Sequence, residues 1–132
     1  MTLNLTTTDK ITIIAEVANA HEGKLSIAKD IVSSIAESAD AVKFQVFTAD
    51  ELVLPSHPDY EEFAELSMSE DEWQELIEYS RSQGVSVIAD VFGTRSVEAM
   101  SSYGVELFKI HNADISNLSL IEDVSTCATA VI

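Results

Sequence analysis

Short apolar runs alternate with longer stretches of helical periodicity from residue 11 onward. The apolar runs predict strands at 11–17, 41–47, 85–92 and 107–111, and a fifth strand beginning near residue 128. The stretches between them predict helices at 25–39, 70–83, 94–103 and 118–125. This alternation is typical of a parallel sheet covered by helices, so the pattern predicts an α/β fold.

The second predicted helix carries signals at both of its ends. Ser69 and Glu72 stand at capping-box spacing, and acidic residues occupy the first turn. Gly84 follows the last turn, where a left-handed residue commonly ends a helix. The preceding segment, 48–68, is longer than a usual βα connection. It is interpreted either as a functional loop or as a surface excursion with a short helix at 60–66.

The composition indicates one packed and acidic domain. With 132 residues, 46% of them hydrophobic, the chain has the size of a single folding unit spanning 1–132. Twenty-three acidic and seven basic residues give a net charge of -16, which repels nucleic acids and anionic membranes. Cys127 is the only cysteine, and residues 1–10 lack the pattern of a secretion signal. We therefore expect a cytoplasmic protein that binds neither nucleic acid nor membrane.

Two of the seven cationic side chains lie inside predicted strands. Lys43 and Gln45 are two residues apart and therefore share one face of their strand, as do Lys109 and His111. The apolar residues between them are expected to pack under helices, which leaves the lysines on the opposite, inward face. A buried ammonium group is costly without an anion, so each lysine needs a negatively charged partner.

Two kinds of partner satisfy this requirement. A protein carboxylate such as Glu16 or Asp90 would form a structural ion pair with a lysine. A bound phosphate or carboxylate would instead make the lysines an anion site, and their position near the carboxyl ends of parallel strands favours this second interpretation.

Two further polar residues lie at the same rim of the predicted sheet. Glu16 closes the first predicted strand, where a carboxylate is suited to orienting sugar hydroxyls. His21 lies in the turn that follows, either as a ligand-facing imidazole that exchanges protons near neutral pH or as a residue that only packs. The chain contains no GxGxxG, P-loop, HExxH or GxSxG motif, so a nucleotide-binding fold, a zinc protease and a serine hydrolase are unsupported.

Five segments occur in the order and spacing of a known enzyme family. They are IAEVANAHEG at 14–23, DAVKFQVF at 40–47, YEEFAELSMS at 60–69, FGTRSV at 92–97 and FKIHNADISNL at 108–118. Together they resemble the N-acetylneuraminate (sialic acid) synthase family over nearly the whole chain. The resemblance implies a (β/α)8 TIM-barrel type fold, of which the first four to five βα units are present.

The resemblance also implies a reaction and a set of partners. In the family, C3 of phosphoenolpyruvate attacks the aldehyde of an open-chain amino sugar resembling N-acetylmannosamine, water adds at C2, and phosphate leaves. The complete enzyme is expected to use a divalent metal, Mn or Mg, whose ligands do not lie in this chain, and to form a homo-oligomer, a dimer. The chain alone is expected to be an inactive fragment of this transferase.

The site residues implied by the resemblance fall into two groups. Lys43 and Lys109 match the lysines that bind phosphoenolpyruvate. Glu16 matches an acidic residue of the sugar site and is assigned a catalytic role together with His21. Gln45, which lies near them, is assigned to substrate binding.

Several residues depart from the family pattern. Ala20 stands where an asparagine is common, and Asp90 replaces a threonine that contacts phosphoenolpyruvate. His111 and Asn112 replace an alanine and a serine, although Asn112 retains a hydrogen-bond donor. Asp90 would repel a triply charged ligand unless a lysine or a metal pairs with it. We assign both Asp90 and Asn112 to substrate binding in a divergent subgroup.

Two alternative functions remain open. The same lysine placement would serve another aldolase-type TIM-barrel synthase acting on a phosphorylated carbonyl compound. A non-catalytic half-barrel that binds a ligand or a second copy would equally account for the length of the chain and for Asp90.

Overall fold

The structure, a computed structural model, describes residues 11–132. The absence of a secretion signal was inferred from residues 1–10, which lie outside this range. The elements are β1 (Ile14–Ala18), α1 (Leu25–Ile35), β2 (Ala41–Val46), α2 (Ala49–Leu52), α3 (Tyr60–Leu66), α4 (Glu70–Ser82), β3 (Ser86–Val91), α5 (Thr94–Ser102), β4 (Leu107–Ile110), the 3-10 turn η1 (Asn112–Asp114), α6 (Leu118–Cys127) and β5 (Ala130–Val131).

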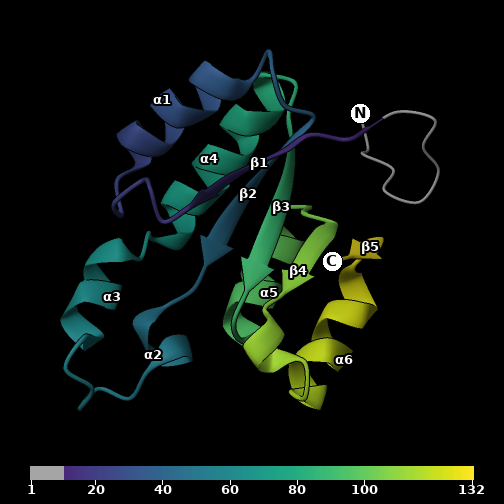
Figure 1. The fold of residues 1–132 in the computed structure, drawn as a ribbon. Coiled ribbons are helices and arrows are strands. Elements are labelled where there is room, and N and C mark those ends of the chain that lie inside the picture. The colour runs from purple at the N-terminus through teal and green to yellow at the C-terminus, as the bar shows by residue number, and fades with distance from the viewer. Residues whose placement is uncertain (1–10) are drawn as a thin grey trace.

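The five strands form one sheet in the order β1-β2-β3-β4-β5, and every neighbouring pair is parallel. A helical segment joins each strand to the next, as the right-handed βαβ rule requires of parallel neighbours. Figure 1 shows this curved sheet with α2 and α3 placed beyond the carboxyl end of β2. The predicted α/β fold of the barrel type is confirmed. Within residues 11–132, no helix is both long enough and apolar enough to cross a membrane.

The element boundaries differ modestly from those predicted. The first helix ends at Ile35 rather than at residue 39, because Ser38 and Ala39 both donate to the Ile35 carbonyl and so close a turn. The short helix at 60–66 is present as α3, which agrees with the surface-excursion interpretation. The helix α2 was missed, although Thr48 and Glu51 form a capping box at its start.

One face of the sheet packs against the helices and forms the main core. Phe44 on β2 is fully buried and meets Trp73 of α4 edge to face, with 5.8 Å between the ring centroids. Residues of β3 and β4 alternate in the same way. The buried side chains on this face of the three strands include Val42, Val46, Val87, Ala89, Val91 and Phe108. The alternation predicted from the sequence is therefore confirmed.

The opposite face carries two layers of side chains. Nearer the amino ends of the strands lies a small apolar cluster of Ala41, Ile88 and Leu107 with Ile14 and Ala130 packed against it. The next inward-facing positions toward the carboxyl ends are polar. We call this second set the polar layer, and it consists of Glu16, Lys43, Gln45, Asp90 and Lys109.

Candidate anion-binding site

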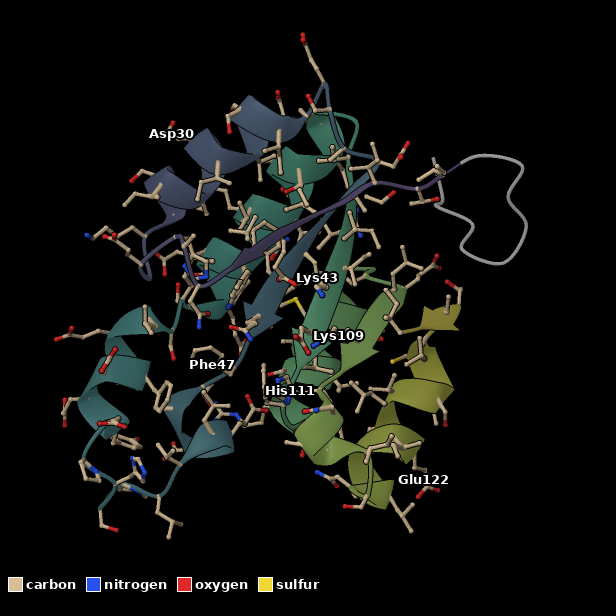
Figure 2. All side chains as sticks on the ribbon, viewed as in Figure 1. Asp30, Lys43, Phe47, Lys109, His111 and Glu122 are labelled. Atoms are coloured by element: carbon tan, nitrogen blue, oxygen red, sulfur yellow. The ribbon has the colours of Figure 1, made fainter. Side chains whose placement is uncertain are left out.

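The polar layer is assembled by the register of four parallel strands. Glu16 on β1 pairs with Lys43 on β2, while Asp90 on β3 lies between Gln45 on one side and Lys109 on the other. Figure 2 shows Lys43 and Lys109 on the same face of the sheet, with His111 nearer the carboxyl ends of the strands. Parallel strands bring residues from distant parts of the chain into one row, and this arrangement places cations and carboxylates in alternation.

Each lysine of the polar layer is held by a carboxylate. Lys43 Nζ lies 2.6 Å from Glu16 Oε2, and Lys109 Nζ lies 2.5 Å from Asp90 Oδ2. Two lysines and two carboxylates leave the layer electrically neutral. The interpretation of the lysines as partners of protein carboxylates is confirmed, and a ligand would therefore bind in exchange for these contacts.

The two ion pairs differ in their exposure to solvent. The Glu16 side chain is 49% exposed, so its carboxylate keeps much of its hydration. The Asp90 side chain is only 2% exposed, so Lys109 rather than water compensates its carboxylate. The Lys43 pair is consequently easy to open, whereas opening the Lys109 pair leaves a buried carboxylate.

The backbone of β1 is irregular where it carries Glu16. The register with β2 shifts between Glu16 and Ala18, and Ala18 has a φ of 48°, in the left-handed region. Glu16 Oε1 accepts a hydrogen bond from the Ala18 amide at 3.2 Å. Bulges of this kind re-aim side chains at the ends of strands, and here the bulge directs Glu16 toward Lys43.

His21 does not belong to the polar layer. Its side chain is fully buried, and its ring meets Trp73 edge to face with 5.7 Å between centroids. Its Nδ1 accepts a hydrogen bond from the Gly23 amide, and burial lowers the pKa of His21, so the ring stays neutral. The structure therefore favours the packing interpretation of His21 over the catalytic role assigned from the sequence.

The two remaining predicted site residues lie at different depths. Gln45 is half-buried in the polar layer, in register with Asp90. Asn112 is exposed in η1, and among residues 11–132 no hydrogen bond joins its side chain to either lysine. Its neighbour His111 lies at a tilt against the ring of Phe92, with 5.6 Å between the ring centroids.

The sequence analysis missed Glu51, which ties together two loops at the carboxyl ends of the strands. Its carboxylate accepts hydrogen bonds from the Thr48 amide, the Ser96 amide and the Ser96 hydroxyl. A Cβ at Gly93 would lie 2.5 Å from Glu51 Oε1, so only glycine leaves room for this contact. The capping-box spacing of Thr48 and Glu51 could have revealed the contact between those two residues from the sequence. The contact of Glu51 with Ser96 could not be seen in this way, because 45 residues separate the two.

Glu51→Ala is expected to lower the free energy of unfolding by about 2 kcal/mol, because it leaves partly buried amide and hydroxyl donors without an acceptor. Urea denaturation followed by circular dichroism measures the change. Glu62→Ala, which removes an exposed carboxylate from α3, serves as the control and is expected to change stability by less than about 0.5 kcal/mol. Equal losses in the two variants would contradict the role given to Glu51.

The described residues offer no site for a protein-bound metal. Between residues 11 and 132, no three histidine, cysteine, aspartate or glutamate side chains come together in a group that could hold an ion. The implied divalent metal therefore does not fit these residues, and we derive no chemical step through it.

Comparison with known proteins identifies the family. The NeuB family model matches residues 31–132. The chain belongs to the NeuB family. Among its relatives, an N,N'-diacetyllegionaminic acid synthase of Legionella pneumophila is 34% identical over 125 residues, which cover 83% of this chain and 35% of that protein. An uncharacterized protein of Methanocaldococcus jannaschii is 32% identical over 121 residues, covering 91% of this chain and 36% of that protein.

A solved structure of a sialic acid synthetase has the same fold. The N-acetylneuraminic acid synthetase of Leptospira borgpetersenii, in complex with citrate, superposes with a TM-score of 0.84 at 25% identity. The match covers 95% of this chain and 47% of that structure. The chain thus spans about a third of the length of the two sequence relatives and about half of this solved structure. The family resemblance drawn from the five sequence segments is confirmed.

Proposed function

We propose that the protein carrying this chain is a sugar-acid synthase that condenses phosphoenolpyruvate with an amino sugar and releases phosphate. The observation that carries the proposal is the polar layer, in which two lysines stand on the face of a parallel sheet that lies opposite the helices. Active sites of such folds are built at the carboxyl ends of the strands. Membership of the NeuB family and similarity to the N,N'-diacetyllegionaminic acid synthase of Legionella pneumophila support a sugar-acid synthase.

The proposed reaction forms one carbon–carbon bond and breaks one bond to phosphate. C3 of phosphoenolpyruvate supplies an electron pair to the aldehyde carbon of the sugar, whose oxygen takes up a proton. Water then adds at C2, and inorganic phosphate leaves from that carbon. The product is a nonulosonic acid, and no oxidant or reductant is consumed.

The lysines would hold the anionic substrate during this reaction. Lys43 would exchange Glu16 for an anionic group of phosphoenolpyruvate, whereas Lys109 would bind a second anionic group while it keeps its contact with Asp90. Ligand binding would release Glu16, whose half-exposed carboxylate would then accept hydrogen bonds from sugar hydroxyls. Gln45 would supply an uncharged donor beside Asp90, on the same face of β2 as Lys43. The divalent metal that the family resemblance implies would require ligands other than residues 11–132.

Lys43→Met in the intact natural protein is expected to weaken phosphoenolpyruvate binding by roughly 10- to 100-fold, the loss typical of one charge-assisted hydrogen bond. Stability is expected to change by less than about 1 kcal/mol, because the remaining Glu16 carboxylate is half exposed to water. Isothermal titration calorimetry measures binding, and urea denaturation measures stability.

The matched control is Lys29→Met. Lys29 lies on α1 and also forms an ion pair, with Glu75 of α4 at 2.5 Å, but on the helical side of the sheet. This variant is expected to bind phosphoenolpyruvate as the wild type does. Equal weakening in both variants would show that net charge, rather than a site at Lys43, governs binding, and the proposed function would then fail.

One observation favours a second candidate, a non-catalytic module in which the lysines only stabilise the sheet. Both lysines already have carboxylate partners, and the layer is neutral. In that case Lys43→Met would leave ligand binding unchanged, and the intact protein would release no phosphate from phosphoenolpyruvate in the presence of N-acetylmannosamine and Mn²⁺. Phosphate release that depends on the sugar would exclude this candidate.

A further inference from the structure

Asp90 has one oxygen bound and one oxygen free. Its side chain is 2% exposed, and its Oδ2 receives the hydrogen bond from Lys109 at 2.5 Å. Its Oδ1 is buried and has no hydrogen-bond partner among residues 11–132. The other buried side-chain atoms of this kind, Asn19 Oδ1 and His21 Nε2, belong to the turn after β1. Asp90 Oδ1 is therefore a buried acceptor of the polar layer that no described protein group satisfies, and a ligand that satisfies it would displace the groups that bury it.

The chemistry of a carboxylate oxygen restricts what that ligand can be. An ionised carboxylate accepts hydrogen bonds and donates none. A fully ionised phosphate or sulfate oxygen is also only an acceptor, so it would meet Oδ1 with charge repulsion and without a shared proton. An oxyanion that still carries a proton on one oxygen can donate to Oδ1 while its other oxygens accept from the lysines.

The strands on either side of β3 place one charged and one neutral residue in register with Asp90. Lys109 on β4 is positive and Gln45 on β2 is uncharged, while the Lys43–Glu16 ion pair of β2 and β1 belongs to the same layer. His111, which follows β4 and stacks on Phe92, is the remaining titratable group at this edge of the layer. Because the lysines and carboxylates cancel, the layer has no excess positive charge with which to overcome repulsion between Asp90 and a fully ionised ligand.

We propose that Asp90 is a specificity-determining residue that selects a phosphate group carrying a proton, by accepting a hydrogen bond from that P–OH at Oδ1. This inference rests on the proposed phosphate-binding function of the polar layer. It assigns to Asp90 a positive role in recognition rather than the merely repulsive one expected from its charge.

Competition between isosteric anions provides the first test, performed by calorimetry on the intact natural protein. Inorganic phosphate keeps a proton at pH 8, whereas sulfate has none. The wild type is expected to bind phosphate at least about tenfold more tightly than sulfate, the cost of an unpaired buried acceptor. In Asp90→Asn, the amide can donate to either anion, and the two affinities are expected to differ by less than about threefold. Equal binding of phosphate and sulfate by the wild type would overturn the proposal.

The pH dependence of phosphoenolpyruvate binding provides the second test. A phosphate monoester loses its last proton with a pKa of about 6, so its protonated fraction falls about 50-fold between pH 6 and pH 8. Wild-type affinity is expected to fall by about that factor, and Asp90→Asn is expected to remove most of the fall. His111→Gln is the control for an effect of the imidazole, and this variant is expected to retain the fall in affinity between pH 6 and pH 8. Loss of the pH dependence in His111→Gln, or its persistence in Asp90→Asn, would overturn the proposal.

These outcomes separate the inference from the function on which it rests. If neither the wild type nor Asp90→Asn binds phosphoenolpyruvate between pH 6 and pH 8, the proposed function fails and Asp90 has no anion to select. If the wild type and Asp90→Asn both bind phosphoenolpyruvate, and neither distinguishes phosphate from sulfate, the anion site is supported and the role given to Asp90 is wrong. A hydrogen bond from Asp90 to a sugar hydroxyl would produce this second pattern, with the loss in Asp90→Asn confined to sugar binding.

Discussion

Lys109→Met is expected to unfold with a free energy about 3 kcal/mol lower than that of the wild type, the scale for removing one partner of a buried ion pair. The reason is the 2% exposure of Asp90, which leaves its carboxylate without a cation or water when Lys109 is lost. The same variant is expected to lose phosphoenolpyruvate binding. Urea denaturation and calorimetry measure the two effects. For Lys43→Met, by contrast, the effect on binding is expected to exceed the effect on stability, because Glu16 is half exposed.

The double variant Asp90→Asn with Lys109→Met separates the two effects. Replacing both charges removes the uncompensated carboxylate, so most of the lost stability is expected to return, as neutral replacements of buried pairs often allow. Binding is not expected to return, because the cation is still absent. A double variant as unstable as Lys109→Met alone would show that Lys109 stabilises the sheet by packing rather than by its pairing with Asp90.

Gly23→Ala is expected to destabilise the protein by about 2–5 kcal/mol, from roughly 1–2 kcal/mol for a left-handed backbone and roughly 1–3 kcal/mol for overpacking. Gly23 has a φ of 67°, and a Cβ there would overlap the backbone carbonyl oxygen of Glu65 in α3. The backbone of a helix cannot move aside as a flexible side chain can. Chemical denaturation of the variant gives the change in free energy of unfolding.

Gly84→Ala is the matched control for the Gly23 substitution. Gly84 also has a positive φ, 83°, but a Cβ there would meet nothing within 4 Å. Its substitution is therefore expected to cost only the conformational part, roughly 1–2 kcal/mol. If both glycine variants lose the same stability, the close approach of Gly23 to Glu65 contributes nothing, and the packing of α3 against the turn after β1 is looser than described.

Local patterns predicted those features of the fold that depend on neighbours in sequence. The capping box of Ser69 and Glu72 is present as expected, with the Ser69 hydroxyl accepting from the Glu72 amide. The two-residue period placed Lys43 and Gln45 on one face because successive side chains of a strand alternate. These patterns involve residues close together in sequence, so they can be recognised without knowledge of the tertiary structure.

Contacts between distant segments were not predictable in the same way. The sequence offered Glu16 and Asp90 as partners for the lysines but could not assign the pairs, because the register of parallel strands is set across 19 to 27 residues. The burial of His21 depends on Trp73, which is 52 residues further along the chain. A motif therefore located His21 near the site, whereas tertiary packing decided which way its ring faces.

The alternation of side chains along β3 keeps position 90 apart from the packing of the helices. Ala89 and Val91 are fully buried against the helices, while Asp90 between them reaches only the polar layer. A substitution at position 90 therefore changes the polar layer and its ion pair with Lys109, while it leaves the contacts between β3 and the helices in place.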